Sequence, residues 1–420
     1  MKNRNAEQHQ PIRDEAAGSR DASQRFQTGG VTMMSAGHGI HDTYTGFLPP
    51  LLPLFISSLS LSKAQAGLLT VFTQAPSLLN PVIGHWADHS HYGRWIFFAP
   101  AVTAASMSLL GEAGSYGMLT LLLLISGLST AAFHAVGPVI AGRLSGRYLG
   151  KGMSFWMFGG ELGRALGPII VVTTIRVVTL DGVPWLMVLG VVASVVLFMR
   201  VQEGDAHIPD RSQAYSWRQA IRQMRPVMVP VVGLIVIRAF MFASLTIFLP
   251  VFLTEEGESL WLAGTALTIV QTAGAVGAFM GGTLSDRLGR RSVLFVGILV
   301  TPLLLFVFLG TGGWIRFLLL SAMGLMLIST TPVIMAVVQE NFSDNRALAS
   351  GTYLCLSFSI RSAIIVVVGV LGDWLGLRLA FIISSVIMLL GLPLVFLLPK
   401  DRLRGMTGEK RWRIWSPPDV

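Results

Sequence analysis

The sequence predicts an all-α integral membrane protein with twelve transmembrane helices in two pseudo-symmetric six-helix bundles. Charged residues make up only 13% of the 420 residues, whereas soluble proteins have roughly 25%. Twelve apolar segments are each near or above the roughly 20 residues that a helix needs to cross a bilayer. The two halves of the chain also repeat, so lipid rather than water is expected to cover most of the surface.

The apolar segments fall into two sets of six, separated by the longest polar stretch outside the tails. The first set is expected at 32–58, 64–86, 94–112, 117–142, 150–175 and 184–200, and the second at 226–253, 260–283, 292–311, 315–340, 348–371 and 378–398. The expected regions are a disordered tail at 1–30, a first bundle at 31–200, a linker at 201–224, a second bundle at 225–399 and a basic tail at 400–420. Because residues 1–30 contain no apolar run, we expect no cleavable signal peptide.

The basic residues lie mostly on one side of the predicted membrane. If the N-terminus is cytoplasmic, 24 Lys and Arg residues lie in cytoplasmic loops and tails, and 4 lie on the opposite side. This asymmetry predicts that both tails are cytoplasmic. Because the positive charge is scattered over loops and tails, it does not favour nucleic-acid binding.

Several function classes have no support in the residues. A single cysteine, Cys355, excludes an intramolecular disulfide and a cysteine-based metal cluster. No phosphate-binding G-x-x-x-x-G-K-[ST] loop occurs, and we find no nucleophile–base set. We therefore expect no enzyme, no ATP-driven transport, no cofactor and no metal, and we expect a monomer whose partners are protons, lipid and a small molecule.

The internal repeat has a nearly constant offset. Three pairs of stretches match at offsets of 201, 198 and 199: "FLP" at 47–49 and 248–250, the loops from Gly84 and Gly282, and the stretches from Gly150 and Ala349. Parallel repeats of this kind are typical of transporters, whose substrate site lies near the bilayer midplane between the halves. The repeat therefore predicts a transporter whose two bundles rock about a central cavity.

The stretch "GGTLSDRLGRR", which begins at Gly281, joins two segments of the second half. Gly282 would allow a neighbouring helix to approach closely, and Gly289 would supply a tight turn. A carboxylate and arginines in one loop can form contacts that break and re-form when the protein changes conformation. We predict a conformational latch from Gly282, Asp286, Arg287, Gly289, Arg290 and Arg291, with a first-half copy from Gly84, Asp88, Gly93 and Arg94.

This loop resembles the loop signature of the major facilitator superfamily. The first-half copy departs from the signature, because two residues are inserted and His89 stands where an arginine is usual. The alternative for the arginines is plain positive-inside topology, which would not explain Gly282, Asp286 and Gly289.

Ionisable residues interrupt the first apolar segment. Asp42 lies about 15 Å along this helix, near the midplane, from the helical rise per residue. His38 is four residues before it and faces both His41 and Asp42 on adjoining turns. Such a group can exchange protons near neutral pH, so we assign proton coupling to Asp42, His38, His41 and Glu161. The alternatives are a polar cluster that fixes helix packing and, with less support, a metal site.

Further polar residues lie within apolar segments and could face the cavity. Arginines there are suited to carboxylates or phosphonates, which a guanidinium can bind through two hydrogen bonds. The predicted substrate-binding residues are Arg238, Arg361, Arg164, His134, Gln74 and Gln271. The arginines could instead neutralise Asp42 or Glu161, and His134 could make an interhelical hydrogen bond. Glu161 and Arg164 could form a proton-sensitive switch or a static ion pair.

The stretch "FGGELGRALGP" at 158–168 predicts close helix packing through its glycines, and it resembles a signature that is common in exporters of the superfamily. The prolines at 49, 50 and 53 are expected to interrupt the outer half of the first helix.

Several stretches resemble the fosmidomycin resistance family of bacterial exporters more closely. They are "HGIHDTYTGFLPPLLP", "GLLTVFTQAPSLLNPVIGHWAD", Phe133-His134 and "VVQENFSDNRALASG". The resemblance implies the major facilitator fold, proton-antiport drug export through Asp42 and His38, and a location in the bacterial inner membrane. Ala135 replaces a proline of the family pattern, and charges are unexpected at Glu161 and Arg164, so the substrate can differ.

The sequence thus favours a proton-coupled antiporter that exports a small drug-like or anionic compound. The alternative is a proton-coupled uptake symporter for an organic acid or a sugar. A membrane sensor or scaffold that does not transport has less support, since no domain is appended beyond the tails.

Overall fold

The computed structural model describes residues 26–80, 83, 91–201, 217–342 and 346–399, and in these ranges every regular element is a helix. The first half contains α2 (Thr28–Thr45), α3 (Leu48–Leu59), α4 (Lys63–Gln74), η1 (Ala75–Leu79), η2 (His91–Phe98), α6 (Ala99–Ser108), η3 (Leu109–Glu112), α7 (Tyr116–Leu144), η4 (Gly146–Tyr148), α8 (Leu149–Val178), η5 (Leu180–Leu186) and α9 (Met187–Arg200). The second half contains α10 (Trp217–Ala243), η6 (Ser244–Phe248), α11 (Leu249–Glu255), α12 (Leu260–Leu288), α13 (Arg290–Gly310), α14 (Ile315–Asn341), α15 (Arg346–Leu375), α16 (Leu377–Leu390) and α17 (Leu392–Leu397).

Each of the twelve predicted segments is helical over most of its described length. Among the described residues, nine helical runs are long and apolar enough to cross a membrane. The other three predicted segments do not reach that standard, each for its own reason. The segment 32–58 is broken in the middle, and 64–86 runs beyond the described residues. In 150–175 the charged residues Glu161 and Arg164 lower the mean hydropathy. One expected boundary moves, because α10 begins at Trp217 and so takes in part of the predicted linker 201–224.

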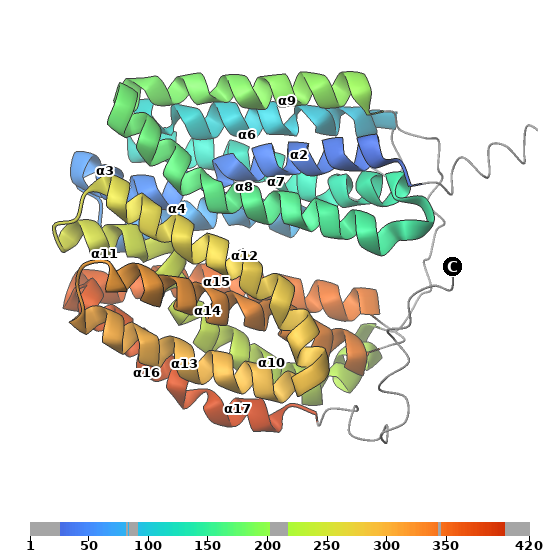
Figure 1. Ribbon diagram of the computed structural model, residues 1–420, viewed down its shortest axis with the longest axis vertical. Coiled ribbons are helices and arrows are strands. Elements are labelled where there is room, and N and C mark those ends of the chain that lie inside the picture. Colours follow the sequence, from blue (N-terminus) through green and yellow to red (C-terminus); the bar gives the residue numbers. More distant parts are fainter. Residues whose placement is uncertain (1–25, 81–82, 84–90, 202–216, 343–345, 400–420) are drawn as a thin grey trace, which may run out of the picture.

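The two halves lie side by side as two sets of helices. In Figure 1 the helices of the first half, coloured blue to green, lie above those of the second half, coloured yellow-green to red. The halves contact each other mainly where α8 packs against α12 and where α4 packs against α15. These pairs occupy corresponding places in the two repeats, as the constant offset predicts.

The first helix breaks just before its prolines rather than among them. α2 ends at Thr45, and α3 begins at Leu48 with proline in its first turn. Proline is tolerated there because the first amides of a helix have no partner within the helix. Gly46 in the break packs closely against the backbone of α8, and Pro53 lies inside α3. The interruption expected at the prolines is therefore placed at Gly46.

The matching point of the second half also departs from α-helical geometry. Residues Ser244–Phe248 form a single π-helical turn, η6, and α11 then begins at Leu249, again with a proline in its first turn. π-Turns are rare and are often found at functional sites. Both copies of the "FLP" stretch therefore mark the same irregular point in the two pseudo-symmetric helices.

One end of the molecule holds the two halves together through charged contacts. The carboxylate of Asp373, at the end of α15, accepts hydrogen bonds from the backbone N–H groups of Lys63 at 2.7 Å and Ala64 at 3.0 Å. These groups are at the N-terminus of α4, where a negative charge is favourable. Lys63 Nζ also lies 2.9 Å from Glu255 Oε1 at the end of α11. The charge distribution predicts that this end faces outside.

We expect Asp373→Asn to loosen this end. A neutral amide cannot make the charge-assisted hydrogen bonds to the start of α4, so the contact between the halves weakens by about 1 kcal/mol. The fraction of molecules in which this end is open should then rise roughly fivefold. Spin labels at the exposed positions Ser58 and Trp374, in a Cys355→Ser background, would report longer distances by pulsed electron paramagnetic resonance. Asp181→Asn, at the same end, is the control. Identical distance distributions in Asp373→Asn and the parent would contradict the expectation.

Candidate functional site

The side chain of Asp42 on α2 is only 2% exposed and is surrounded by groups that can carry positive charge. His41 Nδ1 lies 3.0 Å from Asp42 Oδ1. His38 Nε2 lies 3.4 Å from Oδ2, and His134 Nε2 lies 3.4 Å from Oδ1. Arg164 Nη2 lies 3.4 Å from Oδ2. Three helices, α2, α7 and α8, therefore direct five ionisable side chains to one point, which we call the Asp42 cluster.

Close packing of α8 on α2 brings these residues together. A methyl group added at any of three glycines of α8 would overlap a backbone carbonyl of α2; the pairs are Gly159 with Ser35, Gly163 with Gly39 and Gly167 with Thr43. At Gly160 an added methyl group would overlap the ring of His38. The glycine run therefore acts as predicted, since it lets the helix that carries Arg164 approach Asp42.

Two histidines of the cluster face each other with their Nε2 atoms 3.1 Å apart. His38 Nδ1 lies 2.8 Å from the carbonyl oxygen of Trp156, and His134 Nδ1 lies 2.9 Å from that of Thr130. A carbonyl oxygen only accepts, so each Nδ1 carries a hydrogen and each neutral ring has a lone pair on Nε2. Two lone pairs at this distance repel each other, and one additional proton turns the contact into a hydrogen bond.

The third histidine has a different set of partners. His41 Nε2 lies 3.1 Å from Thr103 Oγ1 on α6. Thr103 donates to Ser129 Oγ at 2.9 Å, and Ser129 donates to the carbonyl oxygen of Ala99 at 2.9 Å. The His41 ring stacks on Phe133 with ring centroids 4.5 Å apart. Hydrogen bonds and stacking together hold the imidazole in one orientation.

The partners of these histidines carry little signal in the sequence. The Trp156 ring stacks on His38 at a centroid distance of 3.9 Å, and Thr103 is fully buried. Threonine and serine are common in membrane helices, where they also bond to their own backbone, so nothing in the sequence distinguishes Thr103 and Ser129. The stretch from Phe155 to Phe158 signals only an aromatic helix face.

Arg164 is shared between two carboxylates. Besides Asp42, its Nη2 lies 3.2 Å from Glu161 Oε1. The side chains of Arg164 and Glu161 are 42% and 32% exposed, unlike that of Asp42. Arg164 therefore joins the buried carboxylate to a more open part of the molecule, and the predicted ion pair with Glu161 is present.

A metal ion is not favoured at the Asp42 cluster. Among the residues that the structure describes, His38, Asp42 and His134 place three potential ligand atoms within 4.8 Å of one another. Arg164 already supplies a positive charge to the carboxylate, however, and a divalent cation would be repelled by the guanidinium.

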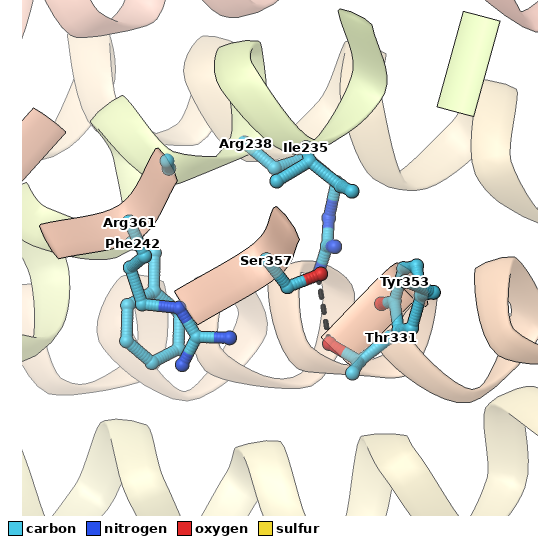
Figure 2. Close-up of a pocket in the computed structure, with 8 residues that line it drawn as sticks. Ile235, Arg238, Phe242, Thr331, Tyr353, Ser357 and Arg361 are labelled. Atoms are coloured by element: carbon cyan, nitrogen blue, oxygen red, sulfur yellow. Dashed lines mark hydrogen bonds between the residues drawn. The ribbon is translucent and has the colours of Figure 1, made fainter. Parts of the chain in front are cut away.

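The second half has a pocket of different character, lined by Ile235, Arg238, Ala239, Phe242, Thr331, Tyr353, Ser357 and Arg361. Its cavity volume is about 30 Å³, which is room for a few water molecules and far below the volume of drug-sized ligand pockets. Figure 2 shows Arg238 and Arg361 reaching toward it from α10 and α15. The two predicted arginines therefore lie in one pocket, which we call the arginine pocket.

Neither arginine of this pocket has a carboxylate partner within the described residues. Arg238 Nη2 donates to Thr331 Oγ1 at 2.8 Å and to the carbonyl oxygen of Leu327 at 3.2 Å, and Nε has no partner. The guanidinium of Arg361 lies over the Phe242 ring, 4.5 Å from its centroid. Ser357 Oγ is buried and also has no partner. Arg238 is 8% exposed and meets no opposite charge among the described residues, and a cation buried in this way is costly. An anion would therefore complete this site.

The remaining predicted substrate residues lie elsewhere. His134 lies against Asp42, which makes it part of the Asp42 cluster and not of the arginine pocket. Gln74, at the end of α4, is half-buried with an unpartnered side-chain oxygen. Gln271, on α12, is also half-buried, and neither glutamine lines the arginine pocket.

The loop between α12 and α13 forms part of the predicted latch. Arg290 Nη2 lies 2.5 Å from Asp286 Oδ1 and 2.7 Å from Glu340 Oε1, which joins α12, α13 and α14. Arg291 donates to the carbonyl oxygens of Phe396 and Leu398. Arg287 is exposed. All of these contacts lie within the second half.

The glycines of this loop differ in what they do. Gly289 has φ +91°, the backbone conformation that the predicted turn needs. An added methyl group at Gly282 would meet nothing within 4 Å, whereas one at Gly281 would overlap the backbone of Ser329. The close approach expected at Gly282 is therefore at Gly281, which faces α14 because it lies one residue earlier around the helix. In the first-half copy, Gly84 and Asp88 lie outside the described residues, and Gly93 and Arg94 are described only as part of the backbone of η2.

Comparison with known proteins places these features in a family. The model of the Major Facilitator Superfamily matches residues 34–365 and 263–417. The chain is 27% identical to the fosmidomycin resistance protein of Escherichia coli (strain K12) over 94% of this chain and 98% of that protein. It is 25% identical to an uncharacterized MFS-type transporter, YfnC, of Bacillus subtilis (strain 168), over 87% and 91% of the two chains.

Solved structures share the fold at low sequence identity. A bacterial homolog of the human lysosomal transporter Spinster, in an inward-facing and occupied conformation, matches with a TM-score of 0.75 and 15% identity over 89% of this chain and 97% of that chain. The nucleoside transporter NupG matches with a TM-score of 0.67 and 12% identity over 87% of this chain and 98% of that chain. These likenesses confirm the predicted helical fold.

We expect Gly163→Ala to destabilise the protein by about 1–3 kcal/mol, because the added methyl group meets a backbone carbonyl that cannot move without separating α2 from α8. Thermal unfolding of the detergent-purified protein would measure the loss. Gly351→Ala is the matched control, since nothing lies within 4 Å of its added methyl group. Equal melting temperatures for Gly163→Ala and the parent would contradict this account of the helix contact.

Proposed function

The chain belongs to the major facilitator superfamily, and we propose that it is a proton-coupled antiporter that exports a small anionic or drug-like compound across the bacterial cytoplasmic membrane by alternating access. Membership makes the chain a multi-pass membrane transporter and not an enzyme. The direction of transport, the coupling ion and the substrate class are the proposal.

The observation that carries the proposal is the Asp42 cluster. A carboxylate that is 2% exposed, with three imidazoles within 3.4 Å, is a site that can gain and lose protons inside the membrane. The Nε2 atoms of His38 and His134 face each other and need one proton between them. Such groups titrate together rather than one at a time, so a change of conformation can load or release protons from the whole cluster.

The arginine pocket supports an anionic substrate. Arg238 and Arg361 lie in a pocket whose described residues include no carboxylate, and guanidinium groups bind carboxylates and phosphonates well. The similarity to a protein named for fosmidomycin resistance supports export of a drug-like compound. One proton moving down 100 mV supplies roughly 2.3 kcal/mol, about a fiftyfold concentration gradient, so one or two protons suffice for export.

The contacts of the helix ends suit a rocking motion. Asp373 and Lys63 join the halves at the end that is predicted to face outside. At the other end, Arg290 joins three helices of the second half through Asp286 and Glu340. In our proposal this loop is a latch that holds the second half rigid while the other end opens.

One observation favours the alternative, proton-coupled symport of an organic acid. Arg164 is shared between Asp42 and Glu161. When Asp42 takes up a proton it loses its charge, and Arg164 becomes available to an anion. Proton and anion would then bind together, as symport requires, whereas antiport requires that they exclude each other.

The proposal is tested with purified protein in liposomes that hold an imposed pH gradient. We expect fosmidomycin, added as the probe among other small anions, to dissipate the gradient in the parent and not in Asp42→Asn, because an amide cannot exchange a proton. Internal pH is recorded with an entrapped dye, and Asp181→Asn should behave like the parent. Substrate and protons moving in opposite directions support antiport, and movement in the same direction supports symport. If no compound in the panel moves protons, proton coupling is wrong.

The arginine pocket has a separate test. We expect Arg361→Met to weaken the binding of the transported anion at least tenfold, because the unpaired guanidinium is lost, and Arg361→Lys to weaken it less, because a charge remains. Binding is measured by calorimetry with the compound that the liposome assay identifies. Exposed Arg200→Met is the control. Unchanged affinity in Arg361→Met would place the substrate outside this pocket.

A further inference from the structure

The hydrogen-bond chain behind His41 points to a role for two hydroxyl residues. We propose that Thr103 and Ser129 are positioning residues that fix the hydrogen of neutral His41 on Nε2, so that His41 and Asp42 hold one exchangeable proton between them. This inference rests on the proposed proton coupling, and it assigns a function to two residues that do not themselves titrate.

The chain has only one consistent direction of donation. The carbonyl oxygen of Ala99 accepts and cannot donate, so the hydrogen of the Ser129 hydroxyl, 2.9 Å away, points at it. Ser129 Oγ must then accept from Thr103, whose own hydrogen is used in that 2.9 Å bond. Thr103 Oγ1 is therefore an acceptor toward His41 Nε2 at 3.1 Å, and Nε2 carries a hydrogen.

This direction determines what His41 presents to Asp42. A neutral ring with its hydrogen on Nε2 has a lone pair on Nδ1, and Nδ1 lies 3.0 Å from Asp42 Oδ1. A lone pair facing an ionised carboxylate oxygen is repulsive. One proton in this contact removes the repulsion, whether it is counted on the imidazole or on the carboxyl group. The fixed tautomer therefore raises the affinity of the pair for a proton.

Burial keeps the hydrogen of neutral His41 on Nε2. His41 and Thr103 are both 0% exposed, so water cannot replace either partner. The charged and titratable groups that face the pair are His38 on α2, His134 on α7, and Arg164 and Glu161 on α8. On the α6 side the partner of His41 is the Thr103 hydroxyl, and α9 contributes no titratable side chain before its last residue, Arg200. The hydroxyl chain is thus the element that decides which ring nitrogen of His41 faces Asp42.

Two substitutions would allow the hydrogen of neutral His41 to leave Nε2, each in a different way. In Thr103→Val the acceptor at Nε2 is gone, so neutral His41 can move its hydrogen to Nδ1 and donate it to ionised Asp42. In Ser129→Ala the Thr103 hydrogen is released, and Thr103 can donate to Nε2, which again favours a hydrogen on Nδ1. Both variants stabilise the deprotonated pair, so both should lower its affinity for a proton.

The experiment is an infrared pH titration of the full chain in liposomes, which follows carboxyl and imidazole bands and needs no substrate. The titration step that disappears in Asp42→Asn belongs to the pair. We expect the midpoint of this step to fall by about one pH unit, a tenfold loss of proton affinity, in Thr103→Val and in Ser129→Ala. Thr103→Ser should keep the parent midpoint, because it keeps the hydroxyl. Ser106→Ala, on the same helix, is the control, since its hydroxyl bonds only to backbone carbonyls.

The outcomes separate this inference from the proposed function. If the Asp42-dependent step is present but its midpoint is unchanged or higher in Ser129→Ala and Thr103→Val, the positioning role is overturned while proton coupling stands. If one variant does not fold, the other decides. If the parent has no Asp42-dependent step, the proton site itself is wrong and the inference is overturned with it.

Discussion

The arrangement of the first half depends on a single constraint, the burial of the Asp42 carboxylate inside a membrane helix. An ionised group in this position is stable only if opposite charge and hydrogen bonds replace water. Arg164 supplies opposite charge, and the three histidines add to it when they hold protons; these groups come from α7 and α8 as well as from α2. The glycine run of α8 is a consequence, because any larger residue would hold Arg164 away from the carboxylate. The aromatic rings of Trp156 and Phe133 then cover the imidazoles.

The two halves share one design but differ in charge. The first half gathers acidic and basic groups that can exchange protons, whereas the arginine pocket of the second half has two guanidinium groups and no carboxylate among the described residues. The repeat places Arg238 opposite Gly37, which packs against Leu197. A duplicated scaffold could thus separate the proposed proton site from the proposed anion site. Coupling would then require a group that both sites can influence, and Arg164, which is partly exposed and shared by two carboxylates, is such a group.

The irregular points of the fold lie where motion would be needed. The break at Gly46 and the π-turn of η6 occupy the same place in pseudo-symmetric helices, and each precedes a proline in the first turn of the next helix. The contact of Asp373 with the start of α4 crosses between the halves, whereas the ion pairs of Arg290 with Asp286 and Glu340 lie within one half. A rigid half that turns as a unit and a separable contact at one end are what alternating access requires.

The sequence by itself determined the features that depend on neighbours along the chain. Apolar length predicted the helices, the spacing of four residues placed His38 beside Asp42, and the loop motif predicted both the turn at Gly289 and the carboxylate–arginine contact. These follow from the pitch of a single helix or the geometry of a single turn. Composition likewise sufficed for the membrane assignment.

Only the tertiary structure decided which helices meet and which faces they turn toward each other. It placed His134 against Asp42 and not in the arginine pocket, moved the close helix contact from Gly282 to Gly281, and connected Thr103 and Ser129 to His41. The physical reason is that the hydrophobic periodicity of a membrane helix is weak, because lipid and protein interiors are both apolar. The rotation of each helix is then set by small residues and by the partners of a few buried polar groups, and these partners are distant in sequence.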